Sequence, residues 1–418
     1  MPKNAKKPQI RFKGFTDAWE QRKLGEVALS FEYGLNVAAK EYDGVNKYLR
    51  ITDIDDESHN FKNNELTSPD IDLTNAYNFR LHEGDILFSR TGASVGKTFI
   101  YKKSDGIVYF AGFLIRARIK SEYDAEFIFQ NTLCSKYEKY IKITSQRSGQ
   151  PGVNAQEYAE YSFLIPKYKE QKQIGKYFYY LDNLITLHQR KLDKLKNIKK
   201  SMLEKMFPKN GSNIPEIRFK GFTDAWEQRK LGEFGKATSG TSIEAEFLHE
   251  GKYKVINIGS YSEISQYIDQ GIRVNKTEKI MNRILNKDDL TMILNDKTSK
   301  GNIIGRVLLI DADDTYVYNQ RTERIEVYKD LFEPNFIYQL LNAENIRKKI
   351  ISSAQGNTQI YINWSIISNF NYFVPLTKSE QKHLANFFDY FDNLITLHQR
   401  KLEKLQNIKK ACLEKMFV

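Results

Sequence analysis

The chain has 418 residues, a formal net charge of +12, a hydrophobic content of 41% and two cysteines. These values predict two or three domains with apolar cores and argue against a disordered chain. The charge favours nucleic acid or an anionic membrane as a partner, although a protein without such a partner can also be basic. No 18-residue apolar run is present to cross a membrane, and the basic start lacks the apolar core of a secretory signal.

The two cysteines, Cys134 and Cys412, lie far apart in the sequence and in unrelated contexts. None of the six histidines stands at metal-ligand spacing from a cysteine or from another histidine. The sequence therefore predicts neither a disulfide framework nor a zinc site. So few cysteines are expected in a reducing compartment, the cytoplasm.

Two recurring segments divide the chain into halves. The leading segment IRFKGFTDAWEQRKLGE at 10–26 returns letter for letter at 217–233. The tail at 181–207 returns at 391–417 with 22 of 27 residues identical. Each half is of domain size, so the chain is a tandem repeat of two domains.

The two middle regions, 27–165 and 234–374, share a pattern but few letters. Alternating aromatic and β-branched residues with turn residues between the runs predict strands at 48–54, 84–90, 98–102 and 108–119. Apolar spacing predicts helices at 125–141 and 334–350. The fold class is therefore α+β. Because the two halves carry different inserts in one repeated frame, we expect them to recognise two different targets.

Each middle region is followed by a long helix. Pro166 and Pro375 end strand-like runs, and apolar residues then recur at steps of three and four up to 207 and 417. A helix of about 40 residues is about 60 Å long and requires a partner, for which its own copy is the obvious choice. Antiparallel packing would separate the two middles by a helix pair with a pseudo-twofold axis, but the sequence leaves parallel packing open.

The segment FSRTGASVGKTF at 88–99 resembles a nucleotide phosphate loop. Such a loop needs four residues between its glycines, whereas Gly92 and Gly96 enclose three. The residues that follow predict a strand or hairpin rather than a helix that could hold phosphates. The corresponding stretch of the second half, LNDKTSKGNIIGR at 294–306, has no Gly-Lys-Ser/Thr. The sequence therefore argues against ATP binding here.

The obvious catalytic signatures are missing together. The sequence has no Gly-x-Ser-x-Gly, no HExxH, no glycine-rich S-adenosylmethionine loop and no Asn/Asp-Pro-Pro-aromatic quartet. Pro69-Asp70 lacks the partner acid and lysine of a nuclease. We therefore expect no catalytic residue, metal site or cofactor in this chain.

Polar loops at matching places in the two halves are candidates for DNA contacts. Arginine, glutamine and asparagine suit base edges, and lysine, serine and threonine suit phosphates. Polar surface loops are common, but two matching sets on a basic chain favour DNA binding. The candidates in the first half are Arg90, Thr91, Ser94, Lys97, Gln146, Arg147, Ser148 and Gln150. Those in the second half are Lys297, Thr298, Ser299, Lys300, Asn302, Gln355, Asn357, Thr358 and Gln359.

Over its whole length the chain resembles the DNA-specificity (S) subunits of type I restriction–modification systems. The resemblance rests on the leading segments ending in WEQRKLGE, the LRITDID strand and the stretch GDILFSRTGASVGK at 84–97. It also includes the helix openings Glu170-Gln171 and Glu380-Gln381 after their prolines. The second half departs from the family pattern, because Gly84-Asp85 becomes Asp288-Asp289 and the Arg90/Gly92 pattern is lost.

The resemblance implies two target-recognition domains, at 1–166 and 209–375, and two helical spacers, at 167–208 and 376–418. Each domain would read one half of a split, asymmetric site in double-stranded DNA. The spacers would dock two methyltransferase subunits, which carry S-adenosylmethionine, and two restriction motor subunits that use ATP and Mg²⁺ can join the complex. The docking residues expected on this basis are Leu184, His188, Leu195, Leu394, His398 and Leu405. His188 and His398 occupy one repeat position, which predicts a polar contact at the helix seam.

Two other functions stay open from the sequence alone. One is a non-specific architectural protein that binds and bridges DNA, and the other is a nucleotide-driven enzyme. The sequence does not identify the bases read or the gap between the half-sites.

Overall fold

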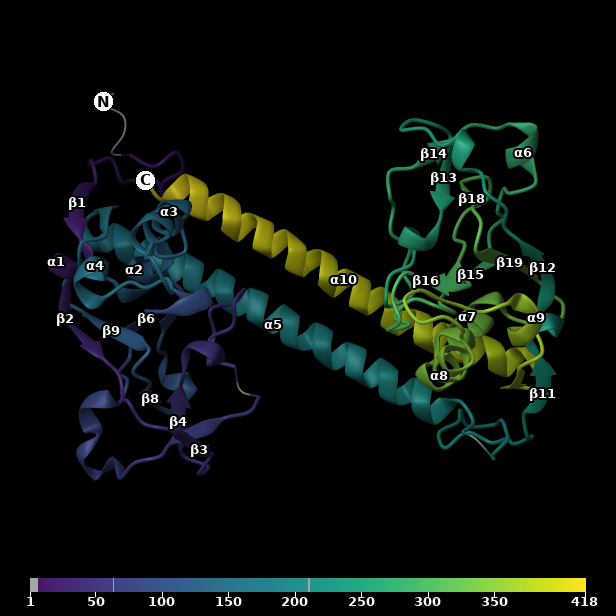
Figure 1. Ribbon diagram of the computed structural model, residues 1–418, viewed down its shortest axis with the longest axis horizontal. Coiled ribbons are helices and arrows are strands. Elements are labelled where there is room, and N and C mark those ends of the chain that lie inside the picture. The colour runs from purple at the N-terminus through teal and green to yellow at the C-terminus, as the bar shows by residue number, and fades with distance from the viewer. Residues whose placement is uncertain (1–6, 63, 210) are drawn as a thin grey trace. The chain divides into compact units, whose positions relative to one another are not determined.

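The computed structural model describes residues 7–62, 64–209 and 211–418. The chain forms two compact units (Figure 1). Unit 1 comprises Met1–Arg190 and His398–Val418, and unit 2 comprises Lys191–Leu397. Each unit therefore combines one middle region with a part of both long helices. None of the described helices is both long and apolar enough to cross a membrane.

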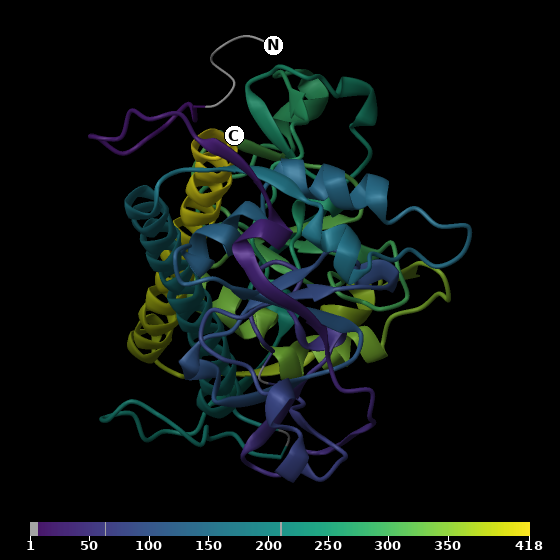
Figure 2. The same ribbon diagram turned by 90° about the vertical axis from the view of Figure 1, so that its left-hand side faces the viewer.

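Unit 1 is an α+β structure. Its strands are β1 (Glu20–Lys23), β2 (Ala28–Tyr33), β3 (Ala39–Glu41), β4 (Asn46–Leu49), β5 (Thr67–Pro69), β6 (Ile86–Ser89), β7 (Thr98–Ile100), β8 (Ile107–Phe110), β9 (Leu114–Ile119) and β10 (Ser162–Ile165). Its short helices are α1 (Leu24–Val27), α2 (Ala125–Asn131), α3 (Ser135–Thr144) and α4 (Ala155–Ala159). Parts of the long helices α5 (Tyr168–Met206) and α10 (Lys378–Met416) lie side by side along one flank of this unit (Figure 2).

Unit 2 repeats this plan. Its strands are β11 (Glu227–Lys230), β12 (Gly235–Ser239), β13 (Tyr253–Ile256), β14 (Arg273–Val274), β15 (Leu290–Ile293), β16 (Asn295–Asp296), β17 (Val307–Leu309), β18 (Tyr316–Tyr318), β19 (Thr322–Val327), β20 (Ile360–Tyr361) and β21 (Asn371–Val374). Its short helices are α6 (Glu278–Met281), α7 (Pro334–Asn342), α8 (Glu344–Ser352) and α9 (Trp364–Ile367).

The central sheets of the two units have the same topology. The strand order is β2-β9-β6-β7 in unit 1 and β12-β19-β15-β17 in unit 2. Within each sheet all neighbours are antiparallel, whereas β4 pairs with β8, and β13 with β18, in parallel. All residues of β6 and β15 are buried, because both faces of these inner strands are covered. The two diverged middles therefore share one backbone design.

Each core includes the end of one long helix. In unit 1, the Phe417 ring, just after α10, lies 5.2 Å from Phe127 and 6.4 Å from Trp19. In unit 2, the Phe207 ring, just after α5, lies 5.9 Å from Trp226. The tryptophans come from the identical leading segments, so the repeated letters form the same aromatic packing in both units.

The leading segments also hold the starts of the long helices through ion pairs. Arg11 donates to both carboxylate oxygens of the buried Glu170, at 2.6 and 2.7 Å. Arg218 donates to Glu380 in the same way, at 2.7 and 2.8 Å. These bidentate pairs explain why arginine and glutamate recur at these positions.

Contacts within each unit show that α5 and α10 run antiparallel, as in the sequence-based hypothesis. In unit 1, Asp182 of α5 pairs with Lys409 of α10 at 2.7 Å, and His188 contacts His398 at 2.9 Å between their Nδ1 atoms. In unit 2 the repeat-equivalent pair, Lys199 with Asp392, lies at 2.6 Å. The predicted histidine contact at the seam is confirmed.

Some predicted elements are divided in the structure. The helix predicted at 125–141 is interrupted between α2 and α3, where Thr132 bonds the Phe129 carbonyl and the Thr98 hydroxyl. The helix predicted at 334–350 is interrupted at the buried Ala343, which is extended. The apolar spacing continues across both interruptions, so the sequence pattern alone does not reveal them.

The strand predictions need similar corrections. The run at 108–119 forms two strands, β8 and β9, joined by a turn in which Leu114 N donates to the Ala111 carbonyl at 2.9 Å. The run predicted at 48–54 ends as β4 at Leu49, and 51–53 form a short 3-10 turn. Apolar and β-branched residues continue through both turns, so the sequence pattern alone does not reveal them.

The two cysteines, far apart in the sequence, lie in the same unit. Both are free thiols in unit 1, and the Cys134 sulfur lies 3.8 Å from the carbonyl of Leu413, the residue after Cys412. Burial raises the pKa of the Cys134 thiol to about 12, which keeps it protonated. The residues that the structure describes contain no cluster of histidine, cysteine and carboxylate side chains suited to a metal ion.

Candidate nucleic-acid interface

In unit 1 the two candidate loops form one surface. Val153 N donates to the Arg90 carbonyl at 2.9 Å, and Gly92 N donates to the Pro151 carbonyl at 3.0 Å. Thr91 forms an isolated antiparallel bridge with Gly152. These backbone bonds bring the segments 90–97 and 145–152 together at the end of β6.

The glycine loop in this surface has a structural explanation. Gly92–Ser94 form one 3-10 turn, and the chain then enters β7 rather than a helix, as predicted. Gly96 has φ +84°, and a Cβ there would lie 2.5 Å from Ile141 Cγ2 of α3. The second glycine therefore allows α3 to pack against the loop, and the loop lacks the helix N-terminus of a nucleotide site.

Arg90 lies beside exposed aromatic side chains at this end of the sheet. Its guanidinium carbon is 5.0 Å from the Tyr33 ring centroid, and its backbone N donates to the Phe113 carbonyl at 3.0 Å. Phe113 is 56% exposed. In the described part of the chain, Arg90 has no carboxylate within ion-pair distance. A guanidinium stacked on one ring keeps its donor edge available for a base or a phosphate.

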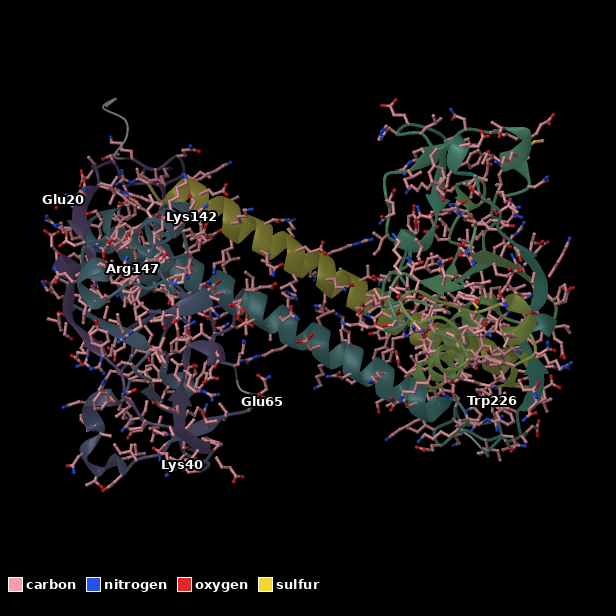
Figure 3. The ribbon with its side chains drawn as sticks, in the orientation of Figure 1. Glu20, Lys40, Glu65, Lys142, Arg147 and Trp226 are labelled. Atoms are coloured by element: carbon pink, nitrogen blue, oxygen red, sulfur yellow. The ribbon has the colours of Figure 1, made fainter. Side chains whose placement is uncertain are left out.

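The other candidates of unit 1 differ in exposure. Thr91 and Ser94 are half-buried, whereas Gln146, Ser148 and Gln150 are exposed. Arg147, which is labelled in Figure 3, donates to Glu157 at 2.5 Å and to the Thr144 carbonyl at 2.7 Å. Arg147 therefore braces the loop as well as carrying a charge.

The side chain of Lys97 is less exposed than we expect for a residue in a surface loop. Its side chain is 11% exposed, donates to the Ile54 carbonyl at 3.2 Å and pairs with Asp56. This lysine ties the glycine loop to the segment after β4. Its contacts are structural in the described state, and a role toward phosphate stays a prediction.

Unit 2 brings its candidate loops together by equivalent bonds. Ile362 N donates to the Leu294 carbonyl at 2.9 Å, which matches the bond from Val153 to Arg90. Strand β16 pairs with β20, and Gln355 and Tyr361 exchange two backbone bonds at 2.8 and 2.9 Å. The segments 295–302 and 355–361 therefore form one surface at the end of β15.

All nine candidates of unit 2 are exposed. They are Lys297, Thr298, Ser299, Lys300, Asn302, Gln355, Asn357, Thr358 and Gln359. Buried Asp296 shapes the first loop by accepting from Thr298 N at 2.9 Å and Ile303 N at 2.8 Å. Asn302 donates to Glu263 at 2.6 Å. The loops present amide, hydroxyl and ammonium groups but no arginine.

The cation after the second loop is buried. Gly305 occupies the position of Gly96: a Cβ there would lie 2.7 Å from Ile350 Cγ2. The next residue, Arg306, donates to the buried Ser265 hydroxyl at 3.3 Å. Burial, together with the neighbouring Arg347, lowers the pKa of Arg306 to about 10. Like Lys97, Arg306 ties its loop to the domain.

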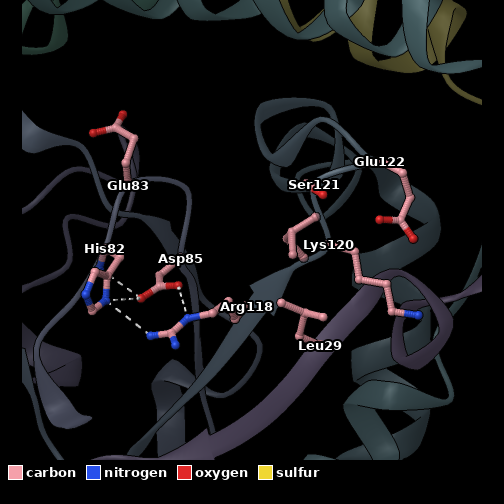
Figure 4. A pocket seen from close by; sticks show the side chains of 9 residues that line it. Leu29, His82, Glu83, Asp85, Arg118, Lys120, Ser121 and Glu122 are labelled. Atoms are coloured by element: carbon pink, nitrogen blue, oxygen red, sulfur yellow. Dashed lines mark hydrogen bonds and ion pairs between the residues drawn. The ribbon is translucent and has the colours of Figure 1, made fainter.

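A hollow of about 570 Å³ in unit 1 lies beside the Asp85 carboxylate (Figure 4). Asp85 accepts from His82 N at 2.9 Å and from Arg118 Nε at 3.2 Å. In unit 2, Asp289 accepts from Asn286 N and pairs with Arg324, both at 2.8 Å. The hollow holds acidic and basic side chains in similar number, so it does not favour a polyanion.

The departure predicted at Gly84-Asp85 leaves the turn unchanged. Asp288 takes φ +72° where Gly84 has +83°. Aspartate tolerates this left-handed conformation better than most residues, so the second unit keeps the turn without glycine. The buried carboxylates of Asp85 and Asp289 thus belong to the frame that both units share.

The expected docking residues on the long helices are mostly enclosed. His398 is buried, Leu195, Leu394, Leu405 and His188 are half-buried, and Leu184 is 45% exposed. Neighbouring apolar side chains that the sequence reasoning missed are more open: Tyr180, Leu187, Tyr390 and Leu397 are between 46% and 62% exposed. Tyr180, Leu184 and Leu187 follow helical spacing, and so do their copies at 390, 394 and 397. Each helix therefore has an outward apolar stripe beside its buried seam.

Comparison with known proteins agrees with this architecture. The family model described as type I restriction modification DNA specificity domain matches residues 16–197 and again 223–407. The chain is 26% identical over 408 residues to the type I restriction enzyme MjaVIII specificity subunit of Methanocaldococcus jannaschii, covering 94% of this chain and 90% of that protein. It is 23% identical to the putative MjaX specificity subunit of the same organism, covering 94% and 91%.

A solved structure has the same fold. The crystal structure of a type I restriction–modification system S subunit from M. genitalium aligns with a TM-score of 0.72 at 13% identity, covering 99% of both chains. At this identity the likeness concerns the fold alone. Because the family model matches both halves of the chain, this protein belongs to the type I restriction modification DNA specificity family and carries two copies of its domain.

Proposed function

We propose that this chain is the non-catalytic specificity subunit of a type I restriction–modification complex, in which each unit reads one half of a bipartite, asymmetric DNA site. The observation that carries the proposal is one frame built twice with different side chains at the same surface. Unit 1 presents Arg90 beside Tyr33, whereas unit 2 presents a lysine-, asparagine- and glutamine-rich pair of loops. Different donors at equivalent places imply different half-sites.

Charge and loop chemistry support DNA as the ligand. The chain carries a formal charge of +12. Arginine and glutamine can contact base edges from these loops, and lysine, serine and threonine can contact phosphates. The named relatives are specificity subunits, in agreement with this role.

The outward stripes support docking of two methyltransferase subunits. Tyr180, Leu184 and Leu187 recur as Tyr390, Leu394 and Leu397, so one kind of partner can bind the same apolar pattern twice. In this proposal the methyltransferase subunits carry S-adenosylmethionine, and two optional restriction subunits carry the ATP- and Mg²⁺-dependent motor. The complex would act in the cytoplasm.

A non-specific architectural DNA-binding protein is the alternative function. Such a protein relies on sequence-independent phosphate contacts, and it has no need for two surfaces of different chemistry. Footprinting on random DNA separates the two: a specificity subunit protects one split motif, and an architectural protein protects none.

The direct test is to map methylated adenines in a host that expresses this chain with its methyltransferase subunit. We expect one split motif with two different halves at a constant gap. Omitting this chain, or supplying Leu187→Lys with Leu397→Lys to charge both stripes, should abolish the modification. Scattered methylation without a motif would contradict the proposal.

The helices can be tested as the ruler between the half-sites. Seven residues inserted directly after His188 and directly after His398, which face each other in the antiparallel pair, keep the seam in register on both sides and should lengthen the preferred gap. The same insertion in only one helix is the control, because it mismatches the seam. An unchanged gap after the double insertion would show that the helices do not set the spacing.

A further inference from the structure

The bonds at the end of the central sheet align the two units residue by residue. Leu294 N donates to the Arg321 carbonyl at 2.9 Å, as Arg90 N donates to the Phe113 carbonyl at 3.0 Å. Gly240 N donates to the Thr322 carbonyl at 2.8 Å, as Gly34 N does to that of Leu114 at 3.2 Å. Ladder pairing agrees: Ser89 faces Leu114 and Ile293 faces Thr322.

Side-chain chemistry is exchanged between these aligned positions. Leu294 stands where unit 1 has Arg90, and Arg321 stands where unit 1 has Phe113. An arginine therefore occurs at the same sheet end in both units, but on different neighbouring strands.

Arg321 is the arginine of unit 2 whose charge has no partner in the described structure. Six others pair with carboxylates: Arg218 with Glu380, Arg229 with Glu227, Arg273 with Asp269, Arg306 and Arg347 with Glu344, and Arg324 with Asp289. The remaining one, Arg283, is held by neutral groups: it donates to the Ser239 carbonyl at 2.7 Å, the Thr241 hydroxyl at 2.8 Å and the Tyr318 hydroxyl at 3.1 Å.

The turn holds Arg321 in an unfavourable conformation. Its φ is +63°, in the left-handed region that favours glycine, and the residue is exposed. Its neighbours are anchored: buried Asn319 accepts from Ile243 N, and Gln320 donates to Glu244, both at 3.0 Å. A large cationic residue at a strained, exposed position adjoining a binding surface indicates a functional role.

We propose that Arg321 is the base-reading arginine of unit 2 and recognises a guanine of the second half-site from the major groove. This inference rests on the proposed function and names a residue for it. The guanidinium can donate two bonds to guanine O6 and N7, which lysine cannot match in geometry. A sequence alignment of the two units on the Arg90 motif places Leu294 opposite Arg90, and it therefore does not reveal Arg321.

The test compares Arg321→Gly, Arg321→Lys and the native chain, each assembled with the methyltransferase subunit. The probes are duplexes of the mapped site and all single base-pair substitutions in both halves. We expect Arg321→Gly to lose about 10- to 100-fold of the preference at one guanine of the second half-site and nothing in the first. Arg321→Lys should keep overall affinity and lose most of that preference.

The Arg321→Gly variant also separates an effect on base recognition from an effect on folding, because glycine adopts the same φ without strain. The melting temperature of Arg321→Gly should equal or exceed that of the native chain. Unchanged discrimination at every position of the second half-site, or a second half-site without guanine, would overturn the inference while leaving the proposed function intact. A native complex without a split motif would overturn both.

Discussion

Units 1 and 2 differ where side chains face solvent at the sheet end and agree where they hold the frame. Arg11 with Glu170 and Arg218 with Glu380 form the same bidentate pair. At the sheet end, by contrast, Arg90 corresponds to Leu294. Frame residues satisfy buried partners within the chain, so a change costs folding energy, whereas surface residues at the loops are free to vary with the ligand.

The frame itself contains a compensated difference. Asp124 caps α2 by accepting from Phe127 N at 2.8 Å, and a Cβ on Gly175 of α5 would lie 2.2 Å from this carboxylate. In unit 2, Glu333 precedes α7 without a side-chain cap, and Ala385 replaces the glycine. Cap and glycine change together because the short capping side chain occupies the space that a helical Cβ would need.

The largest expected effect comes from breaking the shared ion pair. Glu380→Ala leaves the Arg218 guanidinium unpaired and also removes the 3.2 Å bond from Trp226 Nε1, and it should cost about 3–5 kcal/mol of unfolding free energy. Glu170→Ala should cost about 1 kcal/mol less, because Trp19 Nε1 has no partner among the described residues. Urea unfolding of the full chain measures the loss, and hydrogen exchange assigns it to a unit.

The exposed pair of Lys209 and Glu216 provides the control for these variants. Glu216→Ala should leave the unfolding free energy unchanged within error, because solvent screens this pair. If Glu380→Ala were as mild as Glu216→Ala, the ion pair would not be part of the shared frame.

The glycines behind the two loops should respond alike. Gly96→Ala and Gly305→Ala force a Cβ against Ile141 or Ile350 at positive φ, and each should cost about 2–3 kcal/mol. Gly14→Ala separates strain from clash, since Gly14 has φ +98° but nothing within 4 Å of a Cβ, and it should cost about 1 kcal/mol. Thermal unfolding provides the readout. A large cost at only one of Gly96 and Gly305 would break the equivalence of the units.

Arg90→Ala should weaken DNA sequence discrimination without changing the stability of the fold. We expect a loss of about 1–3 kcal/mol of discrimination at the first half-site, with the second unchanged. Fluorescence anisotropy of the complex with the methyltransferase subunit, on duplexes altered in one half at a time, measures this. Arg22→Ala, an exposed arginine of β1, is the matched control. An equal loss of discrimination in the second half-site would remove Arg90 from the reading surface of unit 1.

The smallest effect concerns pH. Burial, opposed in part by the bond from Gln130, raises the pKa of Glu126 from 4.5 to about 7, and Asn335 is its uncharged counterpart in unit 2. The folded state therefore holds its proton to higher pH than the unfolded state, so Glu126 destabilises unit 1 progressively as pH rises from about 4.5 to 7.

Glu126→Gln should remove this dependence. The variant should match the native chain at pH 4.5 and exceed it by about 1 kcal/mol at pH 8, measured by urea unfolding; the half-buried Glu126 remains in contact with solvent, which reduces the effect below that of the full pKa shift. Asn335→Glu should install the same dependence in unit 2. A native chain that gains stability relative to Glu126→Gln as pH rises would reverse the assigned sign.

Sequence patterns predicted the parts of the molecule that depend on local order. The long helices were expected after Pro166 and Pro375 up to 207 and 417, and they extend over Tyr168–Met206 and Lys378–Met416. The helices at 125–141 and 334–350 were expected whole and are interrupted, because apolar spacing does not register a buried turn. The sequence assigned the candidate loops to each half without grouping them, and the enclosure of Lys97 by Asp56 depends on a segment distant in sequence.

By itself, the sequence determined the doubled frame, the α+β class and the strand that follows the glycine loop, because repeated letters, periodicity and motif spacing are local properties. Tertiary structure alone decided that the segments 90–97 and 145–152 form one surface, and that Arg321 corresponds to Phe113. Because the loops of the two units differ in length and letters, the sequence does not show which of their residues correspond. The hydrogen-bond register across the sheet identifies the corresponding residues, since neighbouring strands must satisfy each other's backbone groups.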